Sequence, residues 1–107
     1  MAEGIVIKLT ADFFKILSHP VRIEILHLLK KGERCVCDII EDINIEQSNL
    51  SQHLGLMKKQ GIIESRKDGQ KVIYRIAYPS VMDVVSAAEK TLSEQIDHSQ
   101  SILKFLK

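Results

Sequence analysis

The sequence lacks the features that would assign it to a membrane, a secreted or a multidomain protein. None of its apolar runs approaches the ~18 residues that a membrane-spanning helix needs. It contains no internal repeat, low-complexity tract or linker, and its 107 residues are too few for two independent cores. The first residues do not combine a basic leader with a long apolar segment, which argues against a secretory signal. We therefore expect a single domain over residues 1–107, cytoplasmic and with no membrane partner.

Cysteine is also scarce, because only Cys35 and Cys37 occur, one residue apart in the run 33–39. In a cytosolic chain, two cysteines are more often reduced ligands or redox sensors than a structural bridge. The sequence has no nucleophile–base–orienter set, no phosphate-binding glycine loop and no paired-carboxylate pattern, so it predicts no enzyme. The one enzyme alternative, a thiol–disulfide oxidoreductase, lacks the Cys-x-x-Cys spacing and the strand–helix setting of such folds.

The net charge of +1 conceals two local charges of opposite sign. Residues 58–75 contain six basic side chains against two acidic ones, whereas residues 33–46 contain five acidic side chains against one basic. A chain that is nearly neutral overall can still bind nucleic acid, because binding needs only one basic face.

The spacing of apolar residues predicts a mostly helical domain with one small β-hairpin. Helices are expected over about residues 10–17, 20–30, 36–41 and 48–60, with a hydroxyl cap near Pro20 and with Ser48 as a further N-cap. The period then changes to two on either side of Asp68-Gly69, which is a strong hairpin signal. A last helix begins near Pro79, and its apolar stripe runs over about seven turns. We expect so long and one-sided a helix to pack on a second copy of the chain.

Two short helices, a polar turn and a basic hairpin form the pattern of a winged helix-turn-helix. We expect the helix-turn-helix at about residues 35–61, the wing at about 62–77 and the dimerisation helix at about 80–106. Neutral polar side chains gather at the start of the second helix, the end that a recognition helix presents to the major groove. Basic side chains farther along would contact phosphates. The candidate DNA-contacting residues are Gln47, Ser48, Asn49, Ser51, Gln52, His53, Lys58, Arg66, Lys67, Lys71 and Arg75. The alternative is a winged-helix module that binds protein and not DNA.

The sequence resembles the ArsR/SmtB family of winged-helix metalloregulatory repressors over about residues 10–105. The resemblance is carried by segments 17–26, 48–54, 61–63, 68–70 and 74–76, and by residues 33–39, which match the family's thiol motif except at Arg34 and Ile39. It implies a homodimer that represses a promoter from a palindromic operator on double-stranded DNA until an ion binds. Cys35 and Cys37 fall on positions that bind arsenite or antimonite in arsenic sensors, and cadmium or lead in a related branch. That branch adds N-terminal cysteines, which are missing here, and the family's zinc set in the last helix is effectively absent.

The spacing of the two cysteines constrains how they can hold an ion. Residues two apart on a regular helix are about 200° apart around its axis, so two thiolates meet only in extended or loosened chain. We therefore expect chelation to unwind the start of the third helix and to displace the recognition helix. Arg34 is expected to stabilise a neighbouring thiolate.

The donor set leaves the inducer open. Arsenic(III) prefers three sulfurs, so its third ligand would be a small exogenous thiol or a cysteine of the partner copy. The acidic surroundings suit a divalent cation such as cadmium better. No cofactor is obligatory. Two alternatives to ion sensing are open: the pair senses oxidation through a disulfide, or both cysteines are merely small buried hydrophobes.

Overall fold

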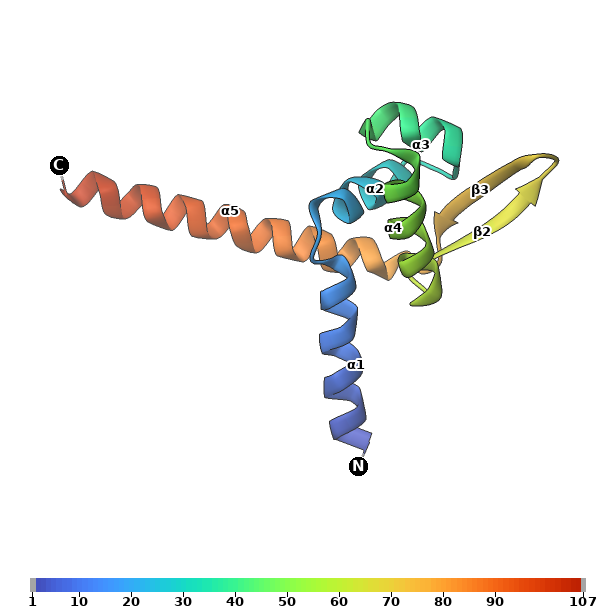
Figure 1. Ribbon diagram of the computed structural model, residues 1–107. Helices are drawn as coiled ribbons and strands as arrows, with labels where there is room; N and C mark the ends of the chain where they lie inside the picture. Colours follow the sequence, from blue (N-terminus) through green and yellow to red (C-terminus); the bar gives the residue numbers. More distant parts are fainter. Residues whose placement is uncertain (1, 107) are drawn as a thin grey trace.

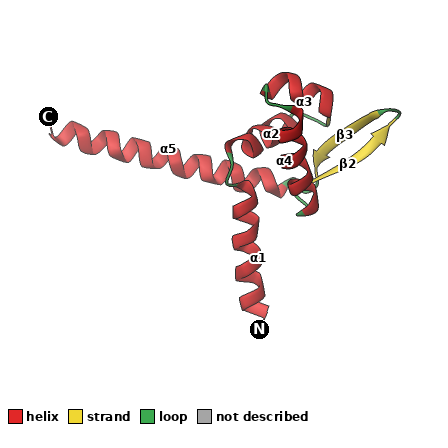
Figure 2. Cartoon of the chain, viewed as in Figure 1, coloured by secondary structure: helices red, strands yellow, loops and turns green. Residues whose placement is uncertain are grey.

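Among the described residues, 2–106, the computed structural model contains five helices and a small three-stranded sheet (Figures 1 and 2). The elements follow in the order α1 (Ala2–Leu17), α2 (Pro20–Lys30), β1 (Arg34–Cys35), α3 (Val36–Ile43), α4 (Gln47–Lys59), β2 (Ile63–Asp68), β3 (Lys71–Ile76) and α5 (Ser80–Leu106). The predicted fold class, mostly helical with a hairpin wing, is confirmed.

The core lies where α2, α3, α4 and the first turns of α5 meet (Figure 1). On α4 the buried side chains are Leu50, Leu54 and Met57, at the helical spacing that the sequence predicted. On α2 the buried side chains are Ile25, Leu26 and Leu29. This core fixes α4 so that its polar N-terminal turns face outward, which places the candidate recognition residues.

The recognition helix begins earlier than predicted. Its N-cap is Glu46, not Ser48, and Gln47 is its first helical residue. The reason is local: Glu46 has extended backbone (φ −60°, ψ 141°), and its carbonyl accepts a hydrogen bond from the Leu50 amide at 3.0 Å. Ser48 therefore lies inside the first turn, where it is exposed.

The cap of α2 also differs from the prediction. No hydroxyl caps this helix; His19 is the N-cap, and its Nδ1 accepts a hydrogen bond from the Val21 amide at 3.1 Å. The nearby Ser18 hydroxyl instead donates to the Lys15 carbonyl at 2.6 Å, at the end of α1. An imidazole nitrogen can thus take the acceptor role that a hydroxyl usually has.

Helix α1 is about twice as long as predicted, because it begins at Ala2 and not near residue 10. Residues 2–9 contain no proline and a single glycine, so nothing in them ends the helix. Leu17 is buried as expected, but Phe14 is 53% exposed and packs edge-on against Phe13. Residues 2–9, the extra length, are all exposed in the protomer.

Helices α1 and α5 project from the core (Figure 1). The radius of gyration is 17.2 Å, whereas a compact domain of this length has about 13 Å. Both helices expose large apolar side chains, namely Ile5, Val6, Ile7, Leu9, Leu92, Ile96, Ile102, Leu103 and Phe105. None of the described helices is long and apolar enough to span a membrane. The apolar faces of these two helices are therefore uncovered in the protomer.

The sheet is antiparallel with the order β1-β3-β2. The wing hairpin, β2 and β3, was predicted, and its turn has Gly69 at φ 64°, where a side chain would be strained. Strand β1 was not predicted. It pairs Arg34 with Tyr74 and Cys35 with Ile73 of β3. The first cysteine is therefore hydrogen-bonded into the same sheet as the wing.

Candidate nucleic-acid interface and thiol site

The polar start of α4 is open to solvent. Five of the six candidate residues in its first two turns are exposed, namely Gln47, Ser48, Asn49, Ser51 and Gln52. Their amides and hydroxyls are the groups that hydrogen-bond base edges. The structure thus presents together what the sequence singled out, and only His53 differs.

His53 is half-buried and turned toward α2. Its Nδ1 accepts a hydrogen bond from Arg22 Nε at 3.1 Å, and its ring lies 4.4 Å from the ring of His19. Burial, together with the positive charges of His19 and Arg22, lowers the pKa of His53. Arg22 also donates from Nη1 to the Ile16 carbonyl at 3.0 Å. His53 therefore connects the recognition helix to α2 and, through Arg22, to the end of α1. The spacing of residues within one helix cannot predict such a contact between helices.

The wing divides its basic residues between two faces. Because side chains alternate along a strand, residues opposite each other in the register share a face. Arg66 lies opposite Ile73, and Arg75 lies opposite Glu64, so these residues belong to one face. Lys67 lies opposite Val72 and belongs to the other.

The two arginines of the wing are engaged in ion pairs. Arg66 Nη2 lies 2.6 Å from Glu33 Oε1, and Arg75 Nε lies 2.5 Å from Glu64 Oε1. The hydrogen bond and the charge of Glu33 raise the pKa of Arg66. Lys67, by contrast, has no ion-pair partner among residues 2–106, and the same holds for Lys58 and Lys71. The candidate phosphate contacts therefore consist of unpaired lysines and charge-balanced arginines.

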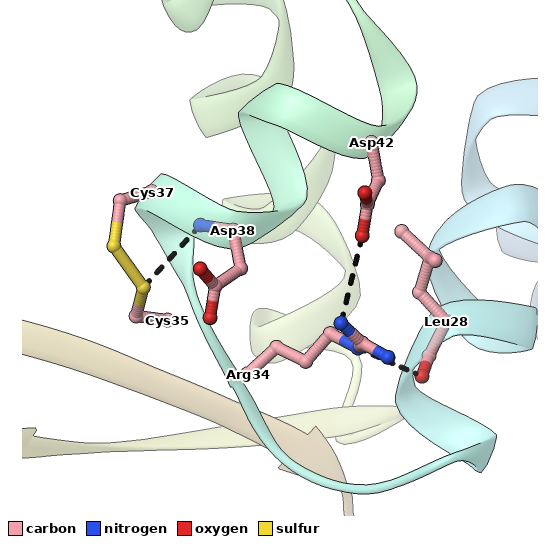
Figure 3. Close-up of polar contacts among 6 residues, drawn as sticks. All are labelled: Leu28, Arg34, Cys35, Cys37, Asp38 and Asp42. Atoms are coloured by element: carbon pink, nitrogen blue, oxygen red, sulfur yellow. Dashed lines mark hydrogen bonds and ion pairs between the residues drawn. A yellow bond between two sulfur atoms is a disulfide. The ribbon is translucent and has the colours of Figure 1, made fainter.

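The two cysteines meet at the junction between β1 and α3 (Figure 3). Cys35 has extended backbone (φ −77°, ψ 160°) and is the N-cap of α3, while Cys37 lies in the first turn. Their sulfurs are joined in a disulfide, with the two Cα atoms 5.3 Å apart. The disulfide that the oxidation alternative required is therefore present.

This arrangement agrees with the expectation that the two sulfurs meet only in extended or loosened chain, because Cys35 has extended backbone; that chelation of an ion unwinds the start of the third helix stays a prediction. Helix α3 begins at Val36 while the sulfurs are bonded. The reason is that Cys35 stands before the helix and not within it, so the angle of about 200° for two helical residues does not apply. The pair can close over the helix start and leave α3 intact.

The two sulfurs differ in their surroundings. Cys35 is 5% exposed, and its Sγ accepts a hydrogen bond from the Asp38 amide at 3.3 Å (Figure 3). Cys37 is exposed. One carboxylate oxygen of Asp38 completes a set of three donor atoms that all lie within 4.8 Å of one another. Once the disulfide is reduced, two soft thiolates and one hard oxygen would be a set that soft divalent metals accept.

Arg34 does not contact either sulfur. Its Nη1 lies 3.5 Å from Asp42 Oδ2, and its Nε donates to the Leu28 carbonyl at 3.3 Å (Figure 3). The expectation that Arg34 stabilises a neighbouring thiolate gains no support from these contacts, because the alternation of β1 turns its side chain toward α2 and the far end of α3. The group that does contact a cysteine sulfur is the Asp38 amide, at the start of α3.

A groove of about 560 Å³ connects the thiol pair with the candidate interface. It runs between the start of α3, the start of α4 and strand β3. Its lining includes Cys37, Ile40, Gln47, Ser51, Lys71 and Tyr74. Three of the candidate DNA-contacting residues therefore share one hollow with the exposed cysteine, an adjacency that the sequence did not reveal.

Comparison with known proteins agrees with this architecture. The family model described as bacterial regulatory protein, arsR family, matches residues 19–65. An uncharacterized HTH-type transcriptional regulator of Mycobacterium tuberculosis is 40% identical over 101 residues, which cover 94% of this chain and 89% of that protein. The crystal structure of M. tuberculosis Rv0081 superimposes with a TM-score of 0.81 at 40% identity, covering 87% of this chain and 94% of that one.

Other similar proteins carry more specific names. A probable mercury resistance operon repressor of Streptomyces lividans is 35% identical over 74% of this chain and 63% of its own length. The cadmium resistance transcriptional regulatory protein CadC of Listeria innocua is 40% identical over 70% of this chain and 64% of its own. A homodimeric winged helix-turn-helix DNA-binding domain from Mycobacterium bovis has a TM-score of 0.80 at 28% identity, covering 90% and 89% of the two chains.

Proposed function

This chain belongs to the ArsR family of winged helix-turn-helix transcriptional regulators, and on that premise we propose that it is a homodimeric repressor released from DNA through Cys35 and Cys37. The observation that carries the proposal is the position of the pair. Its sulfurs lie at the start of α3 and in the groove between α4 and the wing. A ligand on these sulfurs therefore acts where DNA binding is expected to take place.

DNA binding is assigned to the exposed start of α4 and to the unpaired lysines. The side-chain amides of Gln47, Asn49 and Gln52 can form bidentate hydrogen bonds with adenine. The hydroxyls of Ser48 and Ser51 can hydrogen-bond bases or phosphates. Lys58, Lys67 and Lys71 would add phosphate contacts, which supply affinity but little sequence preference. Two such surfaces in a symmetric dimer would read a palindromic operator.

The homodimer is supported by α1 and α5. Their apolar side chains are exposed in the protomer and lie on helices that project from the core (Figure 1). The M. bovis neighbour is described as homodimeric. A second copy that packs on these helices would bury their apolar surface. Each Å² of apolar surface removed from water stabilises the dimer by about 25 cal/mol, which is the ordinary driving force for such an interface.

The inducer that the donor atoms fit best is a thiophilic ion. When the pair is reduced, Cys35, Cys37 and Asp38 would hold cadmium, lead or mercury, since soft thiolates select such ions. Arsenite or antimonite would need a third sulfur from outside the chain. Two relatives are named for resistance to mercury and cadmium, which supports the metal class.

The disulfide supports a second candidate function, a thiol-redox switch with the same residues. In this step each thiol gives one electron and one proton to a peroxide or to a small disulfide, and the bond between the two sulfurs forms. Reduction by a small thiol reverses it. Because an oxidised pair has no thiolate to offer, the two candidates exclude each other at any moment and are separable.

The test is fluorescence anisotropy on labelled DNA from upstream of the protein's own gene, with the pair kept reduced. Cadmium and arsenite are titrated separately, and hydrogen peroxide is added to a third sample. We expect release at near-stoichiometric ion, abolished in Cys37→Ser and Cys35→Ser, both of which keep DNA binding. Release of DNA by peroxide but by neither ion would support the redox switch and contradict ion sensing. Loss of DNA binding in the double variant, Cys35→Ser with Cys37→Ser, would refute this division of roles.

A further inference from the structure

The groove between α4 and the wing has the chemistry of a small-ligand site. Its volume of about 560 Å³ lies within the usual range for small-molecule pockets. Its lining combines apolar side chains, among them Ile40 and Tyr74, with amide and hydroxyl groups of Gln47, Ser51 and Gln70. Lys71 is the single charged residue in the lining. A groove of this kind suits a small peptide-like molecule with a negative charge.

The thiol pair at the end of this groove is poised for attack at one sulfur only. Cys37 is exposed, whereas Cys35 is 5% exposed and holds the Asp38 hydrogen bond. An incoming thiolate therefore reaches the sulfur of Cys37. Cys35 is then the leaving group, and its sulfur holds the hydrogen bond from the Asp38 amide.

We propose that the groove binds a small carboxylate-bearing thiol, which attacks Cys37 and remains there as a mixed disulfide with its carboxylate beside Lys71. This inference deepens the proposed thiol switch and rests on it. In the step, the thiolate forms a bond to Cys37 Sγ and the bond between the two cysteine sulfurs breaks. The electron pair passes to Cys35 Sγ, which takes up a proton from solvent. Nothing is oxidised or reduced overall, so no further reactant is needed.

The adduct has a consequence for DNA binding. Gln47, Ser51 and Lys71 line the groove and are also candidate DNA contacts. A tripeptide-sized group attached to Cys37 would occupy the space next to these side chains and would sterically prevent DNA from contacting them. Repression would then be relieved by occupancy of the groove, without a change in the fold of α3.

The site is tested by the rate of exchange with three thiols of different charge at about 0.15 M salt. The full-length disulfide form is mixed with glutathione, an anionic tripeptide thiol, with neutral 2-mercaptoethanol or with cationic cysteamine, and is quenched early with an alkylating reagent. Intact mass spectrometry should show one thiol and one alkyl group per chain. Peptide mapping should place the thiol on Cys37 and the alkyl group on Cys35.

Charge reversal at Lys71 supplies the discriminating variant. Lys71→Glu should slow glutathione on the order of fivefold, speed cysteamine and leave 2-mercaptoethanol unchanged. The matched control is Lys67→Glu, also in the wing but not in the lining of the groove, and it should change each rate less than twofold. Ratios of variant to wild type cancel the intrinsic reactivity of each thiol. Attachment to Cys35, or equal effects of Lys71→Glu on all three thiols, would overturn the proposal.

A stable adduct tests the effect on DNA. In Cys35→Ser, where serine remains a good N-cap, Cys37 reacts with glutathione disulfide to give an adduct that no second cysteine can resolve. Its DNA affinity should fall at least tenfold, whereas a methylthio adduct on the same sulfur should change it little. Equal affinity for both adducts would refute occupancy of the groove. Ion-induced release from the reduced wild type is measured in parallel, so failure of this inference is distinguishable from failure of the proposed function.

Discussion

Neighbouring basic residues of the wing provide a direct test of the proposed DNA surface. Lys67 and Arg66 are adjacent in β2 but lie on opposite faces of the hairpin, and only Arg66 is neutralised by an ion pair, with Glu33. Each is replaced by glutamine in turn. If the unpaired charge is the one that contacts phosphate, the two substitutions remove the same formal charge but have different effects on the salt dependence of DNA binding.

The expected size follows from counterion release. Each phosphate contact contributes about 0.9 to the magnitude of the slope of log affinity against log salt concentration. In a dimer, Lys67→Gln removes one contact from each protomer, so the magnitude of the slope should decrease by about 1.8. Over a fourfold rise in salt, the affinity of the wild type should therefore fall about tenfold more than that of Lys67→Gln. Arg66→Gln should keep the wild-type slope within about 0.5. Glu33→Gln, which frees Arg66, should increase the slope.

The measurement is anisotropy with reduced protein at several salt concentrations between about 50 and 200 mM. Circular dichroism of each variant confirms that the fold is retained. The diagnostic quantity is the slope. The affinity at a single salt concentration is not diagnostic, because the loss of any positive charge lowers it through the long-range electrostatic field. An equal loss of slope in Arg66→Gln would show that the ion pair opens on DNA, and it would refute the assignment of phosphate contacts to the unpaired lysines.

Three further predictions concern stability and assembly. Ile39→Ala, which removes the one buried side chain of α3, should cost about 2–5 kcal/mol in urea unfolding at fixed protomer concentration, while exposed Glu41→Ala should stay within about 0.5 kcal/mol. Because the pKa of His53 is lowered below its ordinary 6.5, its neutral form contributes stability that is present above that pH and lost as the pH falls through the lowered value. The free energy of unfolding should thus fall more steeply on acidification in the wild type than in His53→Gln, and equal slopes would contradict this. Ile96→Glu, on the exposed apolar face of α5, should shift sedimentation from dimer toward monomer, whereas an unchanged dimer would place the interface elsewhere.

The helical part of the fold was predictable because its apolar period is long and regular. Helix α4 repeats its buried residues over two turns, and α5 repeats its apolar residues over many more although only Val81, Met82 and Val85 are buried among its described side chains, so the pattern exceeds chance. The wing was predictable from turn chemistry at Gly69. The start of α1 was not, since residues 2–9 carry apolar side chains that are exposed in the protomer and so show no single buried face.

The details that organise the site depend on tertiary register, which one sequence does not encode locally. Strand β1 has two residues, too few for any period, and exists only because β3 offers an edge. The ion pair between Arg66 and Glu33 joins positions 33 residues apart. The hydrogen bond from Arg22 to His53 likewise follows from how α2 meets α4. The candidate residues could therefore be named from the sequence, but not their pairing or their division between two faces.

The position of the cysteine pair would give the proposed switch two short routes to the candidate DNA surface. Helix α3 is held by a single fully buried side chain, Ile39, whereas α4 is held by three. Elements with few buried contacts are the ones that yield first. Cys35 is also paired through its backbone with Ile73 of β3, and Glu33 holds Arg66 in β2. If a ligand binds the sulfurs as proposed, it would act directly at the start of α3 and next to the wing, while the three buried side chains of α4 hold the recognition helix in place.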